Sequence, residues 1–356
     1  MQLTNFKTFL DNNHLSYKKD YLLKYETYFK MGGKVNYFVM PNNIDELTVV
    51  INYLRKNDIK FKVIGLTTNV YFIDELEYSI IISTKNLTSL QIRADTIEVD
   101  CGYSLQEFVR VTLLEQSTGY EGLEGIPGSM GGALVMNAGA YGYKISDHLL
   151  TLTCMTEDQK IIVLDKKTCA FKHRDSVFKE NKDWIILSAT FKLIPANQSE
   201  IASKIETYHI ARHTYQEFAY PNLGSLFAVK GDFYREFVKN DRLYYLICYI
   251  LKILYKNPIM KFIMRKNPNN NIFHRLIKKY ILPTKITHTY SSKSMNVLVN
   301  DGISDIDQIL DYISLLKENL KDETPIENEI VIAPIIKEND KIKNIIEKIR
   351  SRGLLT

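Results

Sequence analysis

One stretch of the chain, EGIPGSMGGALVMNAGAYG at residues 124–142, constrains the fold more than any other. Eight of the 16 glycines in the chain lie between Gly119 and Gly142, among small and apolar residues. Glycine and proline are poor residues for the interior of a helix or a strand. The stretch therefore predicts a long loop rather than regular structure.

A glycine loop of this kind suits an anionic ligand. Without Cβ atoms, backbone amides approach a ligand closely, and successive amides form a concave site for a group such as a pyrophosphate. Asn137 adds a side-chain donor and acceptor to the same loop. A long turn packed against its own core has a similar composition, so composition leaves both interpretations open. The loop is not a Rossmann fingerprint, because no strand leads directly into it and no acidic residue follows at the usual distance.

The rest of the chain alternates between strand and helix patterns, which predicts a mixed α and β protein. With 356 residues, of which 45% are hydrophobic, it is long enough for more than one domain. PANQSE at 195–200 is a candidate domain boundary. We expect strands within 35–41, 61–65, 78–84, 95–102, 149–155, 160–165 and 183–194, and helices within 44–57, 104–118, 304–320 (with Ser304 as N-cap) and 341–353.

Charge is unevenly distributed. The net charge is +5, yet residues 230–285 carry 13 Lys or Arg against three Asp or Glu, a net of +10. A local basic segment indicates an anionic ligand or surface there, not general nucleic-acid binding. The simpler interpretation is a set of packed helices with basic faces in solvent, and the alternative is contact with anionic lipid or a phosphorylated substrate. The near-apolar run at 243–255 is too short to span a bilayer.

Cysteine usage and the N-terminal sequence predict a cytoplasmic protein. Cys101, Cys154, Cys169 and Cys248 are widely separated, with no CxxC and no histidine at ligand spacing, so we expect reduced thiols and no metal site. The first 20 residues lack the basic and apolar pattern of a signal peptide.

The string GLEGIPGSMGGALVMNAGAYG closely resembles the flavin-binding signature of the UDP-N-acetylenolpyruvoylglucosamine reductase family. Five further segments are similar to family motifs and occur in the same order, and the resemblance covers nearly the whole chain except about 231–285. They are TYFKMGGKVNYFVMP (27–41), VIGLTTNVYFID (63–74), CAFKHRDSVFK (169–179), YPNLGSLF (220–227) and IENEIVI (326–332).

The resemblance implies an α+β fold: a two-lobed FAD-binding domain of the vanillyl-alcohol-oxidase (PCMH) type plus a C-terminal α+β substrate domain. The expected divisions are lobe 1 at 1–86, lobe 2 at 87–198, a substrate domain at 199–325 that contains the divergent basic segment 231–285, and a C-terminal segment at 326–356 that carries a catalytic glutamate. It also implies FAD as cofactor, with NADPH reducing the flavin, and a nucleotide-sugar substrate.

The resemblance also implies which residues bind the cofactor. Backbone groups of two loops would hold the FAD pyrophosphate, and a third segment would close over the cofactor. The positions are Gly65, Thr67, Thr68 and Asn69 in the first loop, Gly125, Ile126, Pro127, Gly128, Ser129, Gly131 and Gly132 in the second, and Asn137, Ala138, Gly139 and Ala140 in the closing segment. Tyr141, His173 and Lys230 are candidate substrate-binding residues.

Three residues at the family's functional positions match the chemistry of reducing an enolpyruvyl group. Hydride addition leaves an enolate-like species whose charge must be stabilised and whose carbon must be protonated. Arg174 would offer a guanidinium fork to the carboxylate, Ser225 would deliver the proton, and Glu329, kept protonated by burial, would donate a hydrogen bond. Each also has an ordinary interpretation: an ion pair for Arg174, a turn for Ser225 and solvent exposure for Glu329.

The chain departs from the family pattern in the first phosphate loop, where the change bears on flavin binding, and on the substrate side. Thr67 replaces a loop glycine, and His173 replaces the tyrosine before the catalytic arginine. Phe227-Ala228-Val229-Lys230 replaces Phe-Lys-Asn-Pro, and Ser294 replaces a histidine. Besides reduction of a UDP-amino sugar for the cell wall, a paralogue acting on another sugar for a surface glycan, an FAD-dependent alcohol oxidase and a flavin-binding protein without chemistry remain open.

Overall fold

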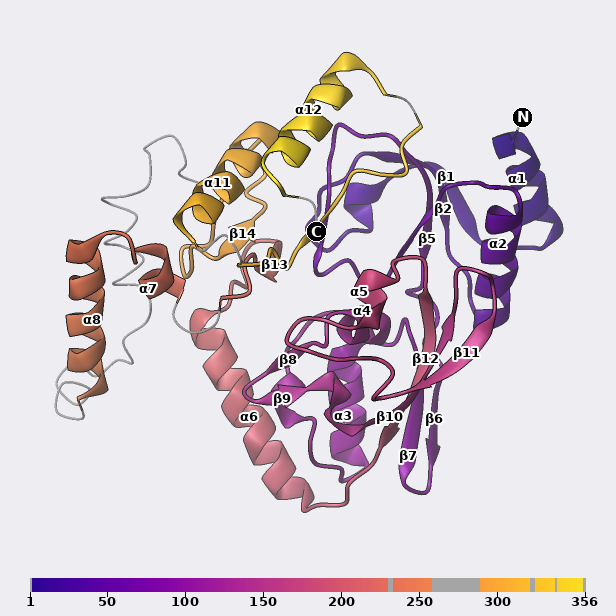
Figure 1. Cartoon of the computed structure of the whole chain (residues 1–356). Helices are drawn as coiled ribbons and strands as arrows, with labels where there is room; N and C mark the ends of the chain where they lie inside the picture. Colours follow the sequence, from indigo (N-terminus) through magenta and orange to yellow (C-terminus); the bar gives the residue numbers. More distant parts are fainter. Residues whose placement is uncertain (1, 230–232, 258–288, 321–323, 337, 355–356) are drawn as a thin grey trace.

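The structure, a computed structural model, describes residues 2–229, 233–257, 289–320, 324–336 and 338–354. Two larger sheets lie beside each other, and the helices α11 (Ile306–Asn319) and α12 (Asp340–Ser351) cover the first sheet from one side (Figure 1). Helix α6 (Gln198–Tyr215) leads from the second sheet to the C-terminal part of the chain. The Lys230 position lies outside the described residues.

The first sheet contains four strands in the order β1-β2-β5-β3. Strands β2 and β3 both pair in parallel with β5, so the expected β–α–β start is confirmed, with one strand inserted between its two strands. The run Ile80–Ile82 of β5 is buried, as expected for a central parallel strand covered on both faces. The bounds are α1 Gln2–Asn12, β1 Tyr17–Leu22, η1 Leu23–Tyr25, β2 Lys34–Val39, α2 Ile44–Lys56, β3 Lys62–Ile64, β4 Val70–Phe72 and β5 Tyr78–Ser83.

The second sheet contains five antiparallel strands in the order β11-β10-β12-β7-β6. Helix α3 begins after Ser104, whose hydroxyl accepts from the Glu107 amide, and buries Phe108 against Tyr120 and Phe191. The bounds are β6 Leu90–Arg93, β7 Thr96–Asp100, α3 Leu105–Leu114, η2 Glu121–Leu123, α4 Met130–Val135, β8 Gly139–Ala140, β9 Tyr143–Lys144, η3 Ile145–His148, β10 Leu149–Met155, β11 Ile161–Asp165, α5 Val177–Glu180 and β12 Ile185–Lys192.

The glycine-rich stretch is not entirely loop, which corrects the sequence-based expectation. Helix α4 begins after Ser129, whose hydroxyl accepts from the Gly132 amide, so a serine N-cap starts a helix despite two glycines in its first turn. Packing favours glycine at one of them, because a Cβ at Gly131 would lie 3.1 Å from the Cys101 Cβ. Close packing, and not helix propensity, accounts for the glycine at position 131.

The C-terminal part contains a two-stranded antiparallel sheet of β13 and β14 and the amphipathic helices α11 and α12. Helix α11 buries the expected stripe of Ile306, Ile309, Leu310, Ile313 and Leu316. Its N-cap is Asp305 and not Ser304, because the Asp305 carboxylate accepts from the Gln308 amide while the Ser304 hydroxyl donates to Asp301. The bounds are β13 Asn222–Ser225, α7 Phe233–Phe237, α8 Arg242–Lys256, β14 Val297–Val299 and β15 Glu329–Val331.

The described part of the divergent segment does not match the simpler sequence interpretation, in which the exposed faces are basic. Helix α8 turns apolar side chains towards solvent: Leu243, Leu246 and Ile253 are each more than half exposed. Its opposite side joins the core through Cys248, Tyr244 and Tyr245. The helix therefore carries apolar side chains on both sides.

Strand β15 ties the C-terminus to the first sheet region. It pairs in parallel with β4, with Glu329 opposite Val70 and Val331 opposite Phe72. The buried Tyr78 hydroxyl accepts from the Ile73 amide at 2.9 Å and donates to the Val331 carbonyl at 3.0 Å. One phenol thus joins two segments that are distant in sequence.

We expect Tyr78→Phe to lower the free energy of unfolding by about 1–3 kcal/mol, because it leaves a buried amide and a buried carbonyl without their partner. Urea denaturation measures the loss. Tyr17→Phe is the matched control, since the Tyr17 hydroxyl bonds to Asp11 at the exposed surface, and we expect a change within about 0.5 kcal/mol. Equal effects of the two substitutions would contradict the bridging role of Tyr78.

Candidate functional site

The two predicted phosphate loops meet. A Cβ at Gly65 would lie 2.1 Å from the Ser129 hydroxyl oxygen, so only glycine allows this approach. The Thr68 hydroxyl donates to the Pro127 carbonyl at 3.1 Å. Gly128 has a φ of +137°, in a region that favours glycine, beside Thr68. The glycines at these positions are therefore needed for loop-to-loop packing.

Thr67 has a left-handed backbone with a φ of +56°, which is rare for a β-branched residue. Its side chain is buried, and its hydroxyl oxygen accepts from the Tyr28 amide at 2.8 Å. The hydrogen bond offsets part of a backbone strain of about 1–3 kcal/mol. The loop thus keeps the conformation that a glycine would adopt freely.

The closing segment carries a polar atom that has no partner among the described residues. Asn137 is buried, and its amide nitrogen donates to the Lys172 carbonyl at 2.8 Å. Its Oδ1 accepts no hydrogen bond from the described part of the protein. Ala138 packs into the core, while Gly139 and Ala140 form the short strand β8. A buried acceptor of this kind is satisfied by a ligand donor or by water.

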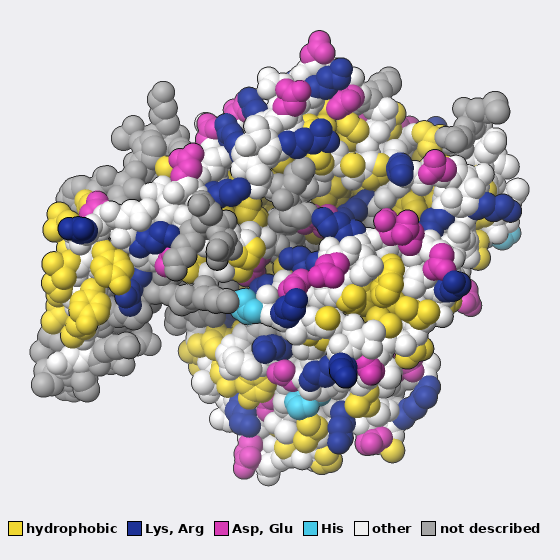
Figure 2. All heavy atoms as spheres, viewed as in Figure 1, with side chains coloured by type: hydrophobic (Ala, Val, Ile, Leu, Met, Phe, Trp, Pro, Cys, Tyr) yellow, Lys and Arg dark blue, Asp and Glu magenta, His cyan; other side chains and the backbone are white. Residues whose placement is uncertain are grey.

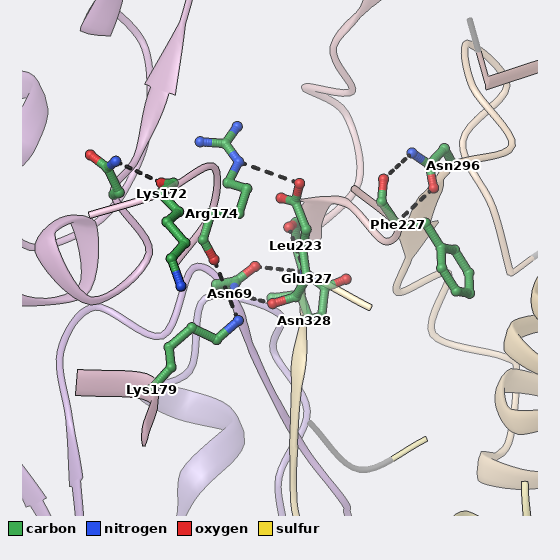
Figure 3. Close-up of polar contacts among 10 residues, drawn as sticks. Asn69, Lys172, Arg174, Lys179, Leu223, Phe227, Asn296, Glu327 and Asn328 are labelled. Atoms are coloured by element: carbon green, nitrogen blue, oxygen red, sulfur yellow. Dashed lines mark hydrogen bonds and ion pairs between the residues drawn. The ribbon is translucent and has the colours of Figure 1, made fainter. Parts of the chain in front are cut away.

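Asn69 joins the first loop to the C-terminal segment. Its Nδ2 donates to the Glu327 carbonyl at 2.6 Å, and its Oδ1 accepts from the Asn328 amide group at 2.8 Å. The Asn328 group also donates to the Leu223 carbonyl at 3.1 Å. Figure 3 shows these side chains converging where three chain segments meet. Asn69, predicted as a cofactor contact, therefore already has structural partners.

Arg174 faces a carboxylate of the C-terminal segment. Its Nε lies 3.3 Å from the Glu327 Oε1, and both side chains are largely buried. Neither Nη nitrogen forms a hydrogen bond to any described residue, and both point away from Glu327 (Figure 3). The residue has a φ of +55°, so the tight turn before α5 sets the direction of the side chain. The sequence alone does not single out Glu327 as its partner.

Glu329 is not buried, which corrects the premise that burial keeps it protonated. Its side chain is 40% exposed and forms an ion pair with the Lys62 ammonium of β3. Strand β15 is only three residues long, and Glu329 at its start lines an open cavity, so water reaches this carboxylate. Lys62 is a partner that no sequence motif indicated.

Ser225 lies at the exposed end of β13. Its neighbours run beside the C-terminal segment, because the Glu327 amide donates to the Leu226 carbonyl at 2.8 Å. Asn296 holds the same segment by exchanging two hydrogen bonds of 3.0 Å with the Phe227 backbone. The Ser225 and Glu327 segments are thus adjacent, and Glu327 brings Arg174 to the same place.

The three candidate substrate-binding residues, Tyr141, His173 and Lys230, differ in their surroundings. His173 is exposed beside Arg174, and Lys230 is not among the described residues. The Tyr141 ring stacks on Tyr208 of α6 at 4.6 Å, and the Arg212 guanidinium lies 5.7 Å from the Tyr141 ring centre. Tyr141 is therefore fixed against α6.

A cavity of about 1040 Å³ opens between the two sheets and the C-terminal segment. That volume is slightly above the range of about 300–1,000 Å³ that is typical of ligand and cofactor sites. Burial, with a smaller effect of Asp100, raises the pKa of the Cys101 thiol at its wall to about 12, so this thiol stays protonated. The residues that line the cavity include Lys62, Gly65, Asn69, Ser129, Gly131, Gly132, Lys179, Glu327 and Glu329.

Arg212 is a charged residue that the sequence motifs did not reveal. It is only 7% exposed, and its Nε donates to the Glu124 carbonyl at 2.9 Å. Its Nη2 is buried and has no hydrogen-bond partner in the described structure. A Cβ at Gly125 would lie 2.8 Å from the Arg212 Cδ, so the side chain runs directly under the second glycine loop. An unpaired buried guanidinium nitrogen is suited to an anion.

Among the residues that the structure describes, no cluster of three or more His, Cys, Asp and Glu side chains is arranged to hold a metal ion. Within the same ranges, no helix combines the length and hydrophobicity needed to cross a membrane.

The chain is similar to known flavoproteins. Residues 35–165 match the model of an FAD binding domain family. A UDP-N-acetylenolpyruvoylglucosamine reductase 2 of Bacillus cereus is 39% identical over 220 residues, which cover 62% of this chain and 71% of that protein. A UDP-N-acetylenolpyruvoylglucosamine reductase of Fervidobacterium nodosum is 36% identical over 207 residues, covering 58% and 67%.

A solved UDP-N-acetylenolpyruvylglucosamine reductase from Thermus caldophilus has a similar fold, with a TM-score of 0.63 at 20% identity over 89% of this chain and 99% of that one. The predicted α+β fold with a two-lobed FAD-binding domain is confirmed, and so is FAD as cofactor. The geometry fits this cofactor: Gly65, Gly131 and Gly132 of the two loops line a cavity of suitable size, the closing segment carries the unpartnered Asn137 oxygen, and Arg212 beneath Gly125 keeps an unpartnered nitrogen.

We expect Asn69→Ala to lower the free energy of unfolding by about 1–3 kcal/mol, because the Glu327 carbonyl and the Asn328 amide group both lose a partner. Chemical denaturation of the flavin-free protein measures this without a contribution from bound cofactor. Asn86→Ala serves as control, since Asn86 is exposed and bonds to Asn42 at 3.3 Å. A loss no greater than that of the control would show that Asn69 does not join the segments.

Proposed function

Because the chain belongs to the UDP-N-acetylenolpyruvoylglucosamine reductase family, we propose that this FAD-dependent oxidoreductase uses NADPH to reduce the enolpyruvyl ether of a UDP-amino sugar to a lactyl ether. The product would be UDP-N-acetylmuramate, a cell-wall precursor. One observation supports this proposal: Glu327, which lines the cavity together with Glu329 and the glycine loops, pairs with Arg174 through its side chain and bonds to the Ser225 segment through its backbone.

The cofactor would be held by residues from both sheets. The amides of the loops at 65–69 and 125–132 would bind its pyrophosphate, as concave glycine loops do. Arg212 would add charge from beneath the second loop, and the Asn137 oxygen would accept a hydrogen bond. When bound, the flavin supplies the hydride chemistry, and the protein positions and polarises the substrate.

Arg174 would bind the carboxylate of the enolpyruvyl group. Its Nε is engaged with Glu327, which holds the guanidinium plane in one orientation. The two Nη nitrogens remain for a bidentate contact with the carboxylate. Charge that develops on this group during reduction is then stabilised by a permanent cation already in place. Glu327 is therefore a positioning residue for Arg174.

Ser225 would protonate the substrate carbon. Its hydroxyl is exposed at the end of β13, so an incoming substrate reaches it without rearrangement of the core. Gly224, with a φ of +71°, sets the turn that presents the hydroxyl. A weakly acidic hydroxyl is a sufficient proton donor for a strongly basic carbon, because the proton transfer is downhill.

Glu329 would act as a hydrogen-bonding carboxyl in the same site. In the described structure it pairs with Lys62, so the arriving substrate carboxylate would have to compete for that ammonium before Glu329 could turn to the substrate. A like-charged carboxylate nearby favours the protonated form of a glutamate. Lys62 would then exchange one carboxylate partner for another.

The residues that follow Ser225 support a second candidate function, in which the chain is a paralogue that reduces an enolpyruvyl group on another sugar. Ala228 and Val229 stand where the family has a Lys–Asn pair, and Val229 packs against the core. No polar side chain at these two positions is available to a sugar or a phosphate. The nucleotide-sugar contacts of this chain would therefore differ from those of the family.

The proposed function is tested by the rates at which the reduced flavin is reoxidised. We expect the purified protein to be yellow and to be bleached by NADPH without oxygen. Ser225→Ala should keep both properties but reduce turnover of UDP-N-acetylenolpyruvoylglucosamine by about 10²–10⁴-fold, the usual contribution of a general acid. Stopped-flow absorbance measures both half-reactions.

Ser203→Ala is the control, because Ser203 is exposed on α6 and its hydroxyl forms no described hydrogen bond. Turnover in Ser225→Ala that equals wild type would remove this residue from the mechanism. Faster reoxidation of the wild type by air than by the enolpyruvyl sugar would favour an oxidase, and turnover of a different enolpyruvyl sugar alone would favour the paralogue.

Arg212→Met should weaken FAD binding by about 10- to 100-fold, which corresponds to the loss of one hydrogen bond to a charged group. Titration of the flavin-free protein by fluorescence measures the dissociation constant directly. Arg110→Met, which changes a charge that is exposed on α3, should leave it unchanged. Arg212→Lys keeps the positive charge but removes the guanidinium, so it separates the effect of charge from that of hydrogen-bond geometry. Unaltered FAD binding in Arg212→Met would exclude a role of this residue at the cofactor.

A further inference from the structure

Helix α8 presents a continuous apolar stripe to solvent. Six of its side chains are between 42% and 65% exposed, and four of them follow the i, i+3, i+7, i+10 spacing of one helix face. In Figure 2, yellow side chains gather at the left edge of the molecule, where Figure 1 places α8. The six are Leu243, Leu246, Tyr249, Ile250, Ile253 and Leu254.

The inner face of the helix fixes the direction of this stripe. Cys248 is buried, and Tyr244 and Tyr245 pack against the same core as α11. The Arg235 guanidinium of α7 lies 5.1 Å from the Tyr245 ring centre and 5.9 Å from that of Tyr249. The helix cannot rotate its apolar stripe inward without giving up these contacts. A clustered apolar surface of this kind marks an interaction site.

Charge identifies the chemistry of the partner. Residues 233–257, which contain α7 and α8, carry five Lys or Arg against two Asp or Glu, and the flanking sequence raises the net charge over 230–285 to +10. The remaining residues have a net charge of −5. An apolar helix face within a basic segment is typical of helices that lie in the interface of an anionic bilayer.

A second copy of this chain fits the same surface poorly. Two copies that met through α8 would bring together two copies of residues 233–257, each with a net charge of +3, and like charges oppose such an association. A spanning arrangement is also excluded by length, since 15 residues of helix extend about 22 Å and a bilayer core needs about 30 Å. A helix lying parallel to the membrane satisfies both constraints.

We propose that the α8 stripe docks this enzyme onto an anionic lipid bilayer. Leu246, Ile250 and Ile253 enter the boundary between headgroups and acyl chains, and Arg242, exposed at the start of α8, contacts the anionic headgroups. The phenol of Tyr249 suits this depth, because its ring is apolar and its hydroxyl is polar. Docking leaves the cavity between the two sheets open, since α8 lies away from both (Figure 1).

Co-sedimentation of the FAD-loaded full chain with vesicles tests this. We expect binding to vesicles of phosphatidylcholine with phosphatidylglycerol, weaker binding at high salt, and little binding to phosphatidylcholine alone. Leu246→Glu combined with Ile250→Glu should lower the affinity for anionic vesicles about 10-fold or more, because it removes apolar contact and adds repelled charge.

The matched control is Leu114→Glu combined with Val163→Glu, which places two charges at apolar side chains that are 69% and 65% exposed on the second sheet region. It should bind like wild type. Flavin absorbance and urea unfolding confirm that both variants are folded. Failure of the wild type to bind, or equal binding by the α8 variant, overturns the proposal. A wild-type dimer in light scattering that the α8 variant dissociates would also overturn it, in favour of a second copy.

Discussion

The docking of the C-terminal segment onto the first glycine loop is the interaction on which the rest of the site depends. Strand β15 adds to β4, and Asn69 and Asn328 hold the preceding residues by hydrogen bonds of 2.6 and 2.8 Å. Without this contact, Glu327 would not reach Arg174, and the cavity would lack one wall. The site is assembled from segments separated by more than 250 residues, so it exists only in the folded chain.

The glycines in the two loops serve packing as well as ligand approach. Gly65 lets the Ser129 hydroxyl come closer than any Cβ would allow, and Gly125 makes room for Arg212. At position 67 a threonine stands in place of a loop glycine. Its backbone is left-handed, which glycine would adopt without strain, and its hydroxyl forms a buried hydrogen bond with the Tyr28 amide. The same loops can therefore remain in position while individual residues change.

The differences from the family concentrate on one side of the molecule. The FAD-binding half keeps its motifs apart from Thr67 in the first loop, and the match to the FAD binding domain lies within it, at residues 35–165. The opposite side has lost a Lys–Asn pair after Ser225 and contains α8 with its exposed apolar stripe. A retained cofactor site beside a remodelled outer surface is expected where the chemistry is kept and the surroundings of the substrate are changed.

Local sequence determined a large part of this structure. The periodicity of Ile and Leu identified α11 and α12, the run of isoleucines identified β5, and the ordered glycine motifs identified the flavin fold, because these signals reside in neighbouring residues. Tertiary structure alone decided that Arg174 meets Glu327, that Glu329 meets Lys62 in an exposed position, that Arg212 runs under Gly125, and that α8 turns its apolar face outward. Those outcomes depend on which distant segments pack together, and a side chain's burial and charge partner are properties of that packing and not of its own neighbours in sequence.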